Sequence, residues 1–592
     1  MSNLPDNSRS DDAQVLLGVV SRLPLFSELG SELQAAIAGE IEWFALPGGT
    51  TLFEAGDAAD ALYFVITGCL GAFAINKESK TRRLLGHITA GEPVGEMALI
   101  SGNPRNATVI ALRDTELGRW SRQGFDALMQ NHPHELLNIT RLIVQRLENS
   151  QRLQGRPAHK ALKIFAVVPQ NPAIDGMGFA TQLVTCLQRY GRTALIQEVH
   201  GTEYTGDWFH NIERTHDFVV YLTDSQATAW TRLCLRQSDS VLLLAAASDA
   251  PQPWLALAAN GKSSQLELRA ELVLLHSQAI APNAARRWLN VVPDIQHHHI
   301  CNVSDMARLT RLITGRGLGL TLSGGGARGF AHIGVMRALE EAGLPVDTAG
   351  GTSIGAIIAG GIAAGWNYEE MVFHIKRSFV ETNPLDDYTF PLISLVAGRK
   401  VSRLLRQEFT DVHIEDLRLP FFCVSSNLTT GHSEVHRTGE LWQWLRASVA
   451  IPGVLPPLFL DGQIFADGAT INNLPVDIMR QQGRGPVIGV DVGAQGVFAA
   501  DSSEADGPPF WNFIRAVTGR EKHINIFQVL LRAGMITGSN NTAMVRSNTD
   551  VLLQPKLGKV DLLNWQAFDE VVEAGYSHAM ENMESIQALL KK

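Results

Sequence analysis

Residues 351–355 read Gly-Thr-Ser-Ile-Gly, a pattern that holds a serine nucleophile at a tight turn. The small residues Gly351 and Gly355 permit the strained passage from strand to helix that exposes a serine hydroxyl. The apolar sequence that follows predicts a buried helix with Ser353 at its N-terminus, where the helix dipole favours negative charge on a reacting carbonyl. The pattern therefore predicts acyl transfer to Ser353.

A second glycine run, Gly324-Gly325-Gly326, follows the strand-like sequence LGLTLS. No side chain shields the backbone N–H groups of these glycines, so they are suited to an oxyanion hole. The longer sequence GGGARG also fits the weak dinucleotide pattern GxGxxG, whereas a phosphate-binding P-loop is excluded because no Gly-Lys-Ser/Thr follows. We expect Arg328 to hold the loop through hydrogen bonds to carbonyl oxygens, with contact to a substrate phosphate as the alternative.

A serine hydroxyl needs a base that accepts its proton. The candidates are His332, in the predicted helix after the glycine loop, and Asp467, at a turn after an apolar segment. A Ser-His-Asp triad in the usual hydrolase order places its histidine after the acid, but only His523 and His578 follow Asp467, both in helix-like sequence. We therefore predict a dyad of Ser353 and Asp467.

A different chemistry is indicated by GEMALISGNPRNATV, residues 95–109. A backbone turn at Gly95 and the guanidinium of Arg105 can bind a phosphate, and the Glu96 carboxylate can accept from a ribose hydroxyl. The alternative is a fold that has lost its ligand and keeps Arg105 only in a surface salt bridge. A DNA-binding helix-turn-helix is not expected after this unit, because an apolar strand follows instead.

The predicted elements divide the chain into a polar tail (1–19) and three domains. Short strand-like segments separated by glycine turns predict a β-roll over 20–155, ending in a helix over 135–154. Alternating strand and helix patterns predict a degenerate, Rossmann-like α/β domain over 160–312, in which no lysine is placed to meet a phosphate. A third, α/β domain covers 316–592 and includes an acidic loop at DSSEADGPP (501–509).

Composition excludes several classes of partner. The net charge of -10 leaves no basic footprint for nucleic acid, and the five cysteines form neither a disulfide framework nor a zinc motif. Consecutive histidines at 297–299 cannot all face one ion, so we predict no metal and no catalytic cofactor. The N-terminus lacks a signal peptide, and the apolar run Ile354–Trp366 is too short for a bilayer, which together predict a cytoplasmic protein.

The three motifs GGGARG, GTSIG and DGA, beginning at 324, 351 and 467, resemble those of patatin-like phospholipases. The resemblance implies that Ser353 and Asp467 form the catalytic dyad, with Gly329 and Gly468 belonging to the supporting motifs. It also implies a phospholipid or lysophospholipid substrate, whose acyl chain and head group the sequence does not specify. A sensor or scaffold with negligible turnover is the alternative.

Residues 95–109 and the preceding LPGGTTLFEAGDAADALYFVITG resemble the phosphate-binding cassette of cyclic nucleotide-binding domains. The resemblance implies that Glu96 meets the 2'-hydroxyl, Arg105 meets the cyclic phosphate, and the backbone at Gly95 and Ala98 lines the pocket. Asn106 occupies a variable position, so cAMP and cGMP both stay open as effectors.

The whole chain looks like the cytoplasmic part of neuropathy target esterase and its bacterial relatives. It shows one cassette domain and no membrane segment, so we expect peripheral contact at the inner face of a membrane. The implied fold is multidomain α/β: a cyclic nucleotide-binding β-roll, an α/β middle domain and a patatin-like α/β hydrolase domain. The oligomeric state is not predicted.

Overall fold

The computed structural model describes residues 30–75, 82–89, 91–131, 162–199, 206–258, 269–292, 295–493, 547–558 and 560–590, together with Leu17, Gly18, Ser21 and Val545. It forms two compact units, residues 1–277 with 288–310 and residues 278–287 with 311–592. Most of the predicted N-terminal tail, the predicted helix over 135–154, the acidic loop at 501–509 and His523 lie outside the described residues. The predicted domain limits stay predictions.

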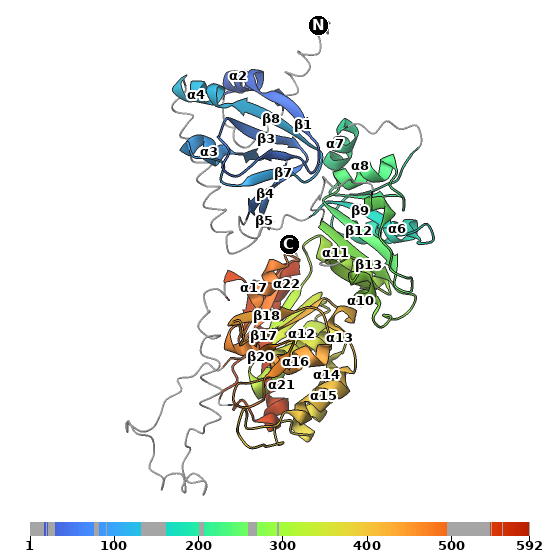
Figure 1. Cartoon of the computed structure of the whole chain (residues 1–592), viewed down its shortest axis with the longest axis vertical. Coiled ribbons are helices and arrows are strands. Elements are labelled where there is room, and N and C mark those ends of the chain that lie inside the picture. The colour runs from blue at the N-terminus through green and yellow to red at the C-terminus, as the bar shows by residue number, and fades with distance from the viewer. Residues whose placement is uncertain are drawn as a thin grey trace. The chain divides into compact units, whose positions relative to one another are not determined.

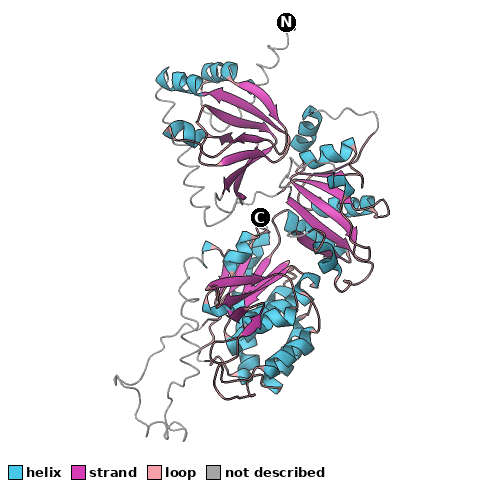
Figure 2. Cartoon of the chain, viewed as in Figure 1, coloured by secondary structure: helices cyan, strands magenta, loops and turns pink. Residues whose placement is uncertain are grey.

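The N-terminal part of the first unit is an antiparallel β-roll, which confirms the predicted class (Figures 1 and 2). One sheet has the order β1-β8-β3-β6 and the other β2-β7-β4-β5. Strand β3 is buried from Ala61 to Val65, because its apolar side chains face helices on one side and the second sheet on the other. The elements are β1 (Glu42–Leu46), β2 (Thr51–Phe53), β3 (Ala61–Thr67), β4 (Cys69–Ile75), β5 (Arg82–Thr89), β6 (Pro93–Val94), β7 (Thr108–Ala111), β8 (Thr115–Ser121), α2 (Ser31–Glu40), α3 (Glu96–Ser101) and α4 (Arg122–Asn131).

The middle part of the chain is an α/β sheet in the order β10-β11-β9-β12-β13-β14, and every pair of neighbouring strands in it is parallel. Parallel strands are covered on both faces, so their sequences are nearly continuous apolar runs, as in IFAVVP of β9. The elements are β9 (Ile164–Pro169), β10 (Thr193–Ile196), β11 (Phe218–Leu222), β12 (Ser240–Ala246), β13 (Arg269–Leu275), β14 (Gln296–Ile300), α6 (Gly176–Leu187), α7 (Gly206–Thr215), α8 (Ala229–Gln237), α9 (Leu255–Ala258), α10 (Ala284–Leu289) and α11 (Val303–Ile313).

The second unit is built on a mixed sheet in the order β19-β20-β17-β16-β15-β21-β22, with β18 also paired to β17. The strands from β17 to β22 along this order are parallel, and β18, β19 and β20 add antiparallel pairs. The strands are β15 (Gly319–Leu322), β16 (Thr348–Thr352), β17 (Phe421–Asn427), β18 (His432–His436), β19 (Leu458–Leu460), β20 (Gln463–Asp467), β21 (Val487–Val490) and β22 (Val551–Leu553).

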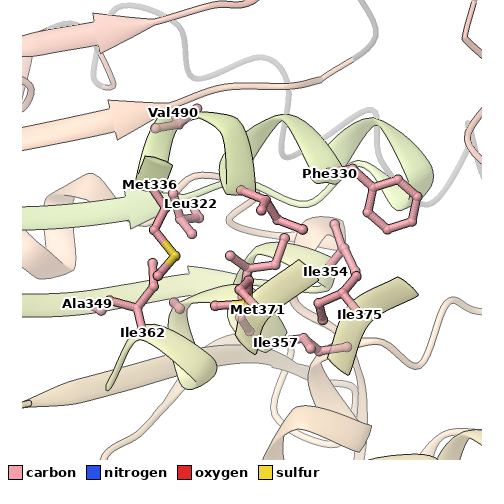
Figure 3. Packing of buried hydrophobic residues seen from close by; sticks show 14 of the residues in the cluster. Leu322, Phe330, Met336, Ala349, Ile354, Ile357, Ile362, Met371, Ile375 and Val490 are labelled. Carbon is pink, nitrogen blue, oxygen red and sulfur yellow. The ribbon is translucent and has the colours of Figure 1, made fainter. Parts of the chain in front are cut away.

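The helices of this unit flank the sheet. They are η1 (Gly326–Phe330), α12 (Ala331–Glu341), α13 (Ile354–Ala364), α14 (Tyr368–Ile375), η2 (Lys376–Glu381), α15 (Arg399–Phe409), η3 (Ile414–Asp416), α16 (Leu441–Ser448), η4 (Gly468–Thr470), α17 (Val476–Gln481), η5 (Trp565–Ala567), α21 (Phe568–Glu581) and α22 (Met583–Leu590). Helix α13 is apolar on all sides and is buried from Ile354 to Ala363, as the sequence predicts. Figure 3 shows Ile354 and Ile357 of α13 near Met371 and Ile375 of α14 in the core that supports the site.

Candidate active site

Ser353 lies at a strained turn between β16 and α13. Its φ of 56° and ψ of -129° are unusual for a residue with a side chain, and such strain is typical of nucleophiles at strand-to-helix turns. A Cβ on Gly351 would lie 2.7 Å from the Leu322 carbonyl oxygen, and one on Gly355 would press even closer to the same atom. The two glycines are therefore required for β15 and the turn to pack together.

The Ser353 hydroxyl donates to Asp467, with Oγ and Oδ2 2.8 Å apart. Both residues are buried, 5% and 2% exposed. Asp467 is the last residue of β20, which pairs with β17. The Asp467 Oδ1 accepts a hydrogen bond from the Ala469 N–H at 2.8 Å. Two hydrogen bonds thus orient both carboxylate oxygens, one of them toward Ser353.

Burial controls the acidity of this carboxyl group. It raises the pKa of Asp467 from its usual 3.8 to about 7, while the hydrogen bonds from Ala469 and Ser353 act in the opposite direction. A group with a pKa near neutrality is well suited to accept a proton and return it. The arrangement can therefore activate the Ser353 hydroxyl without a histidine.

The glycine loop lies against this pair, but its first amide is occupied. The Gly324 N–H donates to the Asn473 side-chain oxygen at 3.1 Å and to the Asn473 carbonyl at 3.3 Å. The Gly324 N–H, expected from the sequence to be free for an oxyanion, is thus hydrogen-bonded within the protein in this structure. Gly326, whose φ of 55° favours glycine, lines the same cavity as Ser353. The oxyanion role of Gly325 and Gly326 stays a prediction.

Arg328 ties the glycine loop to the end of β21. Its Nε donates to the Val492 carbonyl at 2.8 Å and its Nη2 to the Gly493 carbonyl at 3.3 Å. A Cβ on Gly329 would clash with the Ile354 side chain at the start of α13, and one on Gly468 would clash with the Val424 carbonyl. The motif residues around the dyad thus position the loop, the serine turn and β20.

His332 is fully buried, and its Nε2 lies 2.9 Å from the Ser323 carbonyl oxygen. Burial lowers its pKa to about 4, so the ring is neutral at physiological pH.

Ser448 was not identified from the sequence: its hydroxyl accepts from the Ser353 N–H at 2.9 Å and donates to the Val424 carbonyl at 2.7 Å. No local sequence motif indicates the roles of Ser448 and Asn473, because their hydrogen-bond partners lie far away along the chain.

An apolar cavity of about 70 Å³ opens beside Ser353. Its polar wall includes Glu408, which bonds to His374 at 2.6 Å and to Ser378 at 2.8 Å. The cavity is lined by Gly326, Ser353, Ile354, Ile357, Trp366, His374, Ile375, Ser378, Phe379, Pro384, Leu385, Val401, Leu404, Leu405, Glu408, Phe409, Val449, Ile451, Leu455 and Trp565. Such a lining suits an aliphatic chain attached to a carbonyl at Ser353.

In the β-roll, Arg105 is buried among protein groups and not on the surface. Its Nη1 donates to the Gly95 carbonyl at 2.9 Å and its Nη2 to the Ala61 carbonyl at 2.7 Å, while the guanidinium carbon lies 4.3 Å from the centre of the Phe53 ring. The nearest carboxylate, Asp60, is 3.3 Å from Nη2. The alternative of a surface salt bridge alone is therefore wrong for Arg105.

The other predicted cassette residues lie at α3 or next to Arg105 in the sequence. Gly95 has a φ of 85° and precedes α3, which begins at Glu96, and Ala98 is buried in that helix. Asn106 faces Met97, with Nδ2 and Sδ 3.9 Å apart. The structure thus brings Gly95 and Arg105 into contact.

The consecutive histidines of β14 have separate partners: His298 bonds to Glu271 at 2.7 Å, and His299 to His276 at 2.9 Å. Within the described part of the chain, no three His, Cys, Asp or Glu side chains group in a way that could hold a metal ion. Likewise, no helix among the described residues is long and apolar enough to cross a bilayer.

Three family models match the chain in succession. Residues 43–132 match the cyclic nucleotide-binding domain, residues 161–314 the neuropathy target esterase family P-loop like domain, and residues 320–480 the patatin-like phospholipases. The fold and the site thus define a patatin-like domain that follows a cyclic nucleotide-binding domain. The chain belongs to the neuropathy target esterase family of patatin-like phospholipases.

Curated relatives align with more than nine tenths of this chain. Patatin-like phospholipase domain-containing protein 6 of Pongo abelii is 30% identical over 91% of this chain and 44% of its own length. Lysophospholipase nte1 of Emericella nidulans is 27% identical over 93% of this chain and 42% of its own. This chain therefore spans less than half of these relatives. A solved cyclic nucleotide-binding domain from Methylobacillus flagellatus is 25% identical over 23% of this chain and 79% of that one, with a TM-score of 0.21.

Proposed function

We propose that this protein is a serine acyl hydrolase. Ser353 Oγ attacks the ester carbonyl while Asp467 accepts the hydroxyl proton, and the Gly325 and Gly326 amides stabilise the resulting oxyanion. The protonated Asp467 then donates to the departing alcohol, leaving an acyl-enzyme. Asp467 next accepts a proton from the water that attacks the acyl-enzyme, and it returns this proton to Ser353 Oγ as the acid is released. The observation that carries this proposal is the buried 2.8 Å contact between Ser353 and Asp467 beside an apolar cavity.

The substrate we propose is a phospholipid or lysophospholipid. Two observations support it: the apolar lining of the cavity accepts a fatty acyl chain, and a relative 27% identical to this chain is named a lysophospholipase. No catalytic cofactor is needed, because the dyad and the backbone amides supply both proton transfer and charge stabilisation. Such a substrate resides in membranes, so a cytoplasmic protein with peripheral membrane contact is part of the proposal.

The test is covalent labelling of the full chain with a fluorophosphonate probe, followed by hydrolysis of a lysophospholipid. We expect labelling of the parent protein, none of Ser353→Ala, and strongly reduced labelling of Asp467→Asn. Ser577→Ala, a change at an exposed position of α21 outside both pockets, is the control and should label normally. An unlabelled parent protein would instead favour a sensor or scaffold with negligible turnover.

A second proposal concerns the β-roll: it binds cAMP or cGMP, and the nucleotide regulates hydrolysis. The match to the cyclic nucleotide-binding domain and the contact between Gly95 and Arg105 support a nucleotide site. Regulation requires a free energy of coupling between the two sites, which is measured as a change in rate. Hydrolysis of a soluble ester with and without each nucleotide tests it, and equal rates with binding shown separately would remove regulation from the proposal.

A further inference from the structure

Helix α15 has two faces with different chemistry. Val401, Leu405 and Phe409 are buried and line the cavity beside Ser353. On the other side, Arg399, Arg403 and Arg406 are exposed, at the spacing of four and three residues that places side chains on one helical face. Helix α15 therefore forms one wall of the proposed acyl cavity and carries a basic surface on its opposite side.

These three arginines line a second pocket, of about 540 Å³. Among the described residues that line it, four are arginines and none is acidic. Arg406 lies over the Trp442 ring, 4.1 Å from its centre. The lining, here called the arginine pocket, consists of Arg399, Ser402, Arg403, Arg406, Gln407, Trp442, Arg446, Pro457 and Leu458.

Arg446 gives this pocket a buried donor. It is 5% exposed, and its Nη2 donates to the Pro456 carbonyl at 2.8 Å. Its Nη1 has no hydrogen-bond partner among the described residues. Burial lowers the pKa of Arg446 to about 10, although the charge of Asp387 opposes this. A buried guanidinium with an unused N–H is costly unless an anion completes its hydrogen bonds.

An exposed apolar segment precedes α15 in the chain and is separated from it by residues 394–398. In residues 388–393, here called the apolar loop, Phe390 is 78% exposed and Leu392 is 83% exposed, and Tyr388 and Ile393 are exposed as well. The loop is held at its base, where the Thr389 N–H donates to Leu395 O and the Leu395 N–H to Gly453 O. Large apolar side chains gathered on one exposed segment mark a surface that meets an apolar partner.

We propose that the arginine pocket and the apolar loop together dock this protein on a membrane that contains anionic phospholipids. The pocket binds a head-group phosphate, which arginine recognises with paired N–H donors, and the apolar loop enters the acyl layer. Charge complementarity selects this occupant, because a basic pocket without acidic lining, on the helix that follows an exposed apolar loop, matches the phosphate and hydrocarbon layers of a bilayer.

The bound phosphate belongs to a lipid other than the one being cleaved. Helix α15 lies between the arginine pocket and the cavity beside Ser353, and an α-helix with its side chains is about 10 Å thick. Within a single phospholipid, only a few bonds separate the ester from the phosphate. The docking surface therefore goes beyond the proposed hydrolysis, and its test does not require turnover.

Sedimentation of the full chain with vesicles tests the proposal. Vesicles of phosphatidylcholine with phosphatidylglycerol should bind the parent protein and Ser353→Ala equally, and those of phosphatidylcholine alone more weakly. The pair Arg399→Gln with Arg403→Gln should weaken binding about thirtyfold, since each basic residue near an anionic surface contributes about fivefold. The pair Phe390→Ser with Leu392→Ser should weaken it at least tenfold.

Matched controls remove similar side chains elsewhere. Arg122→Gln with Arg192→Gln removes two arginines whose side chains are 44% and 73% exposed, and Met580→Ser removes a side chain from a residue that is 44% exposed. These should bind vesicles as the parent does, and all variants except Ser353→Ala should hydrolyse a soluble ester normally, which shows that they fold. Undiminished vesicle binding by either test pair overturns the proposal. Inorganic phosphate that binds through Arg399 and Arg403 while vesicles do not would assign the pocket to free phosphate and also overturn it.

Discussion

Replacing Asp467 by asparagine should abolish hydrolysis and stabilise the folded chain at alkaline pH. The carboxyl group is buried, and its pKa is raised from 3.8 to about 7. At about 1.4 kcal/mol for each pH unit, this difference corresponds to about 4 kcal/mol that the folded state loses when the carboxylate is charged. The proposed base thus lowers stability at the pH where it functions.

The sign follows from proton uptake. Between pH 4 and pH 7 the carboxyl group is charged in the unfolded chain and neutral in the folded one, so the free energy of unfolding falls as the pH rises through this interval. Asparagine is neutral throughout, and its amide can still accept from the Ala469 N–H and donate to Ser353 Oγ. The stability advantage of Asp467→Asn should therefore grow by about 2–3 kcal/mol from pH 5 to pH 8.

Hydrogen exchange under graded urea measures this advantage locally, in peptides from the buried helix α13 of the full chain. Comparing the variant with the parent at each pH cancels the intrinsic pH dependence of exchange. Ser353→Ala keeps the carboxylate and should show no comparable gain at pH 8. An advantage of Asp467→Asn that is the same at both pH values, or a variant less stable than the parent at pH 8, would refute the assigned pKa.

Three further outcomes are expected. The kcat/KM for a soluble ester should fall about tenfold for each pH unit below pH 7 and level off above it, and a rate unchanged down to pH 5 would exclude Asp467 as the base. Gly355→Ala should lower the free energy of unfolding by more than about 2 kcal/mol, because its Cβ would meet the Leu322 and Ser323 carbonyls, whereas Gly360→Ala finds its nearest neighbour 3.6 Å away and should be neutral or stabilising by up to about 1 kcal/mol. Titration calorimetry should show about tenfold weaker cyclic nucleotide binding by Glu96→Gln, and an unchanged affinity would remove Glu96 from the site.

The parts of the site that could be predicted depend on local sequence. A strand, a small-residue turn and an apolar helix follow one another around Ser353, so residues 348–364 largely determine their own geometry. Asp467 was found because a turn follows its apolar strand. Ser448 and Asn473 were missed because Ser448 bonds to a residue 95 positions away and Asn473 to one 149 positions away, and the order of strands in the sheet brings them together.

The contacts of Arg105 in the β-roll also could not be predicted from local sequence. The pattern GEMALISGNPRNATV placed it in a nucleotide cassette, but the carbonyl of Ala61 that it meets is 44 positions away. Its position over the Phe53 ring depends on how the strands pack, and no local pattern contains that information. The bonds that now hold its guanidinium compete with a cyclic phosphate for the same N–H donors.

The arginine pocket depends on both local sequence and tertiary packing. The helical period of RKVSRLLRQEF separates its arginines from its apolar residues, but only the fold adds Arg446 of α16 to the same pocket. Four like charges around one hollow repel one another, and the repulsion is weakest when an anion or salt neutralises them. If the pocket binds phosphate, vesicles that contain phosphatidylglycerol should relieve this repulsion and raise the free energy of unfolding of the patatin-like domain. The pair Arg399→Gln with Arg403→Gln should remove that gain.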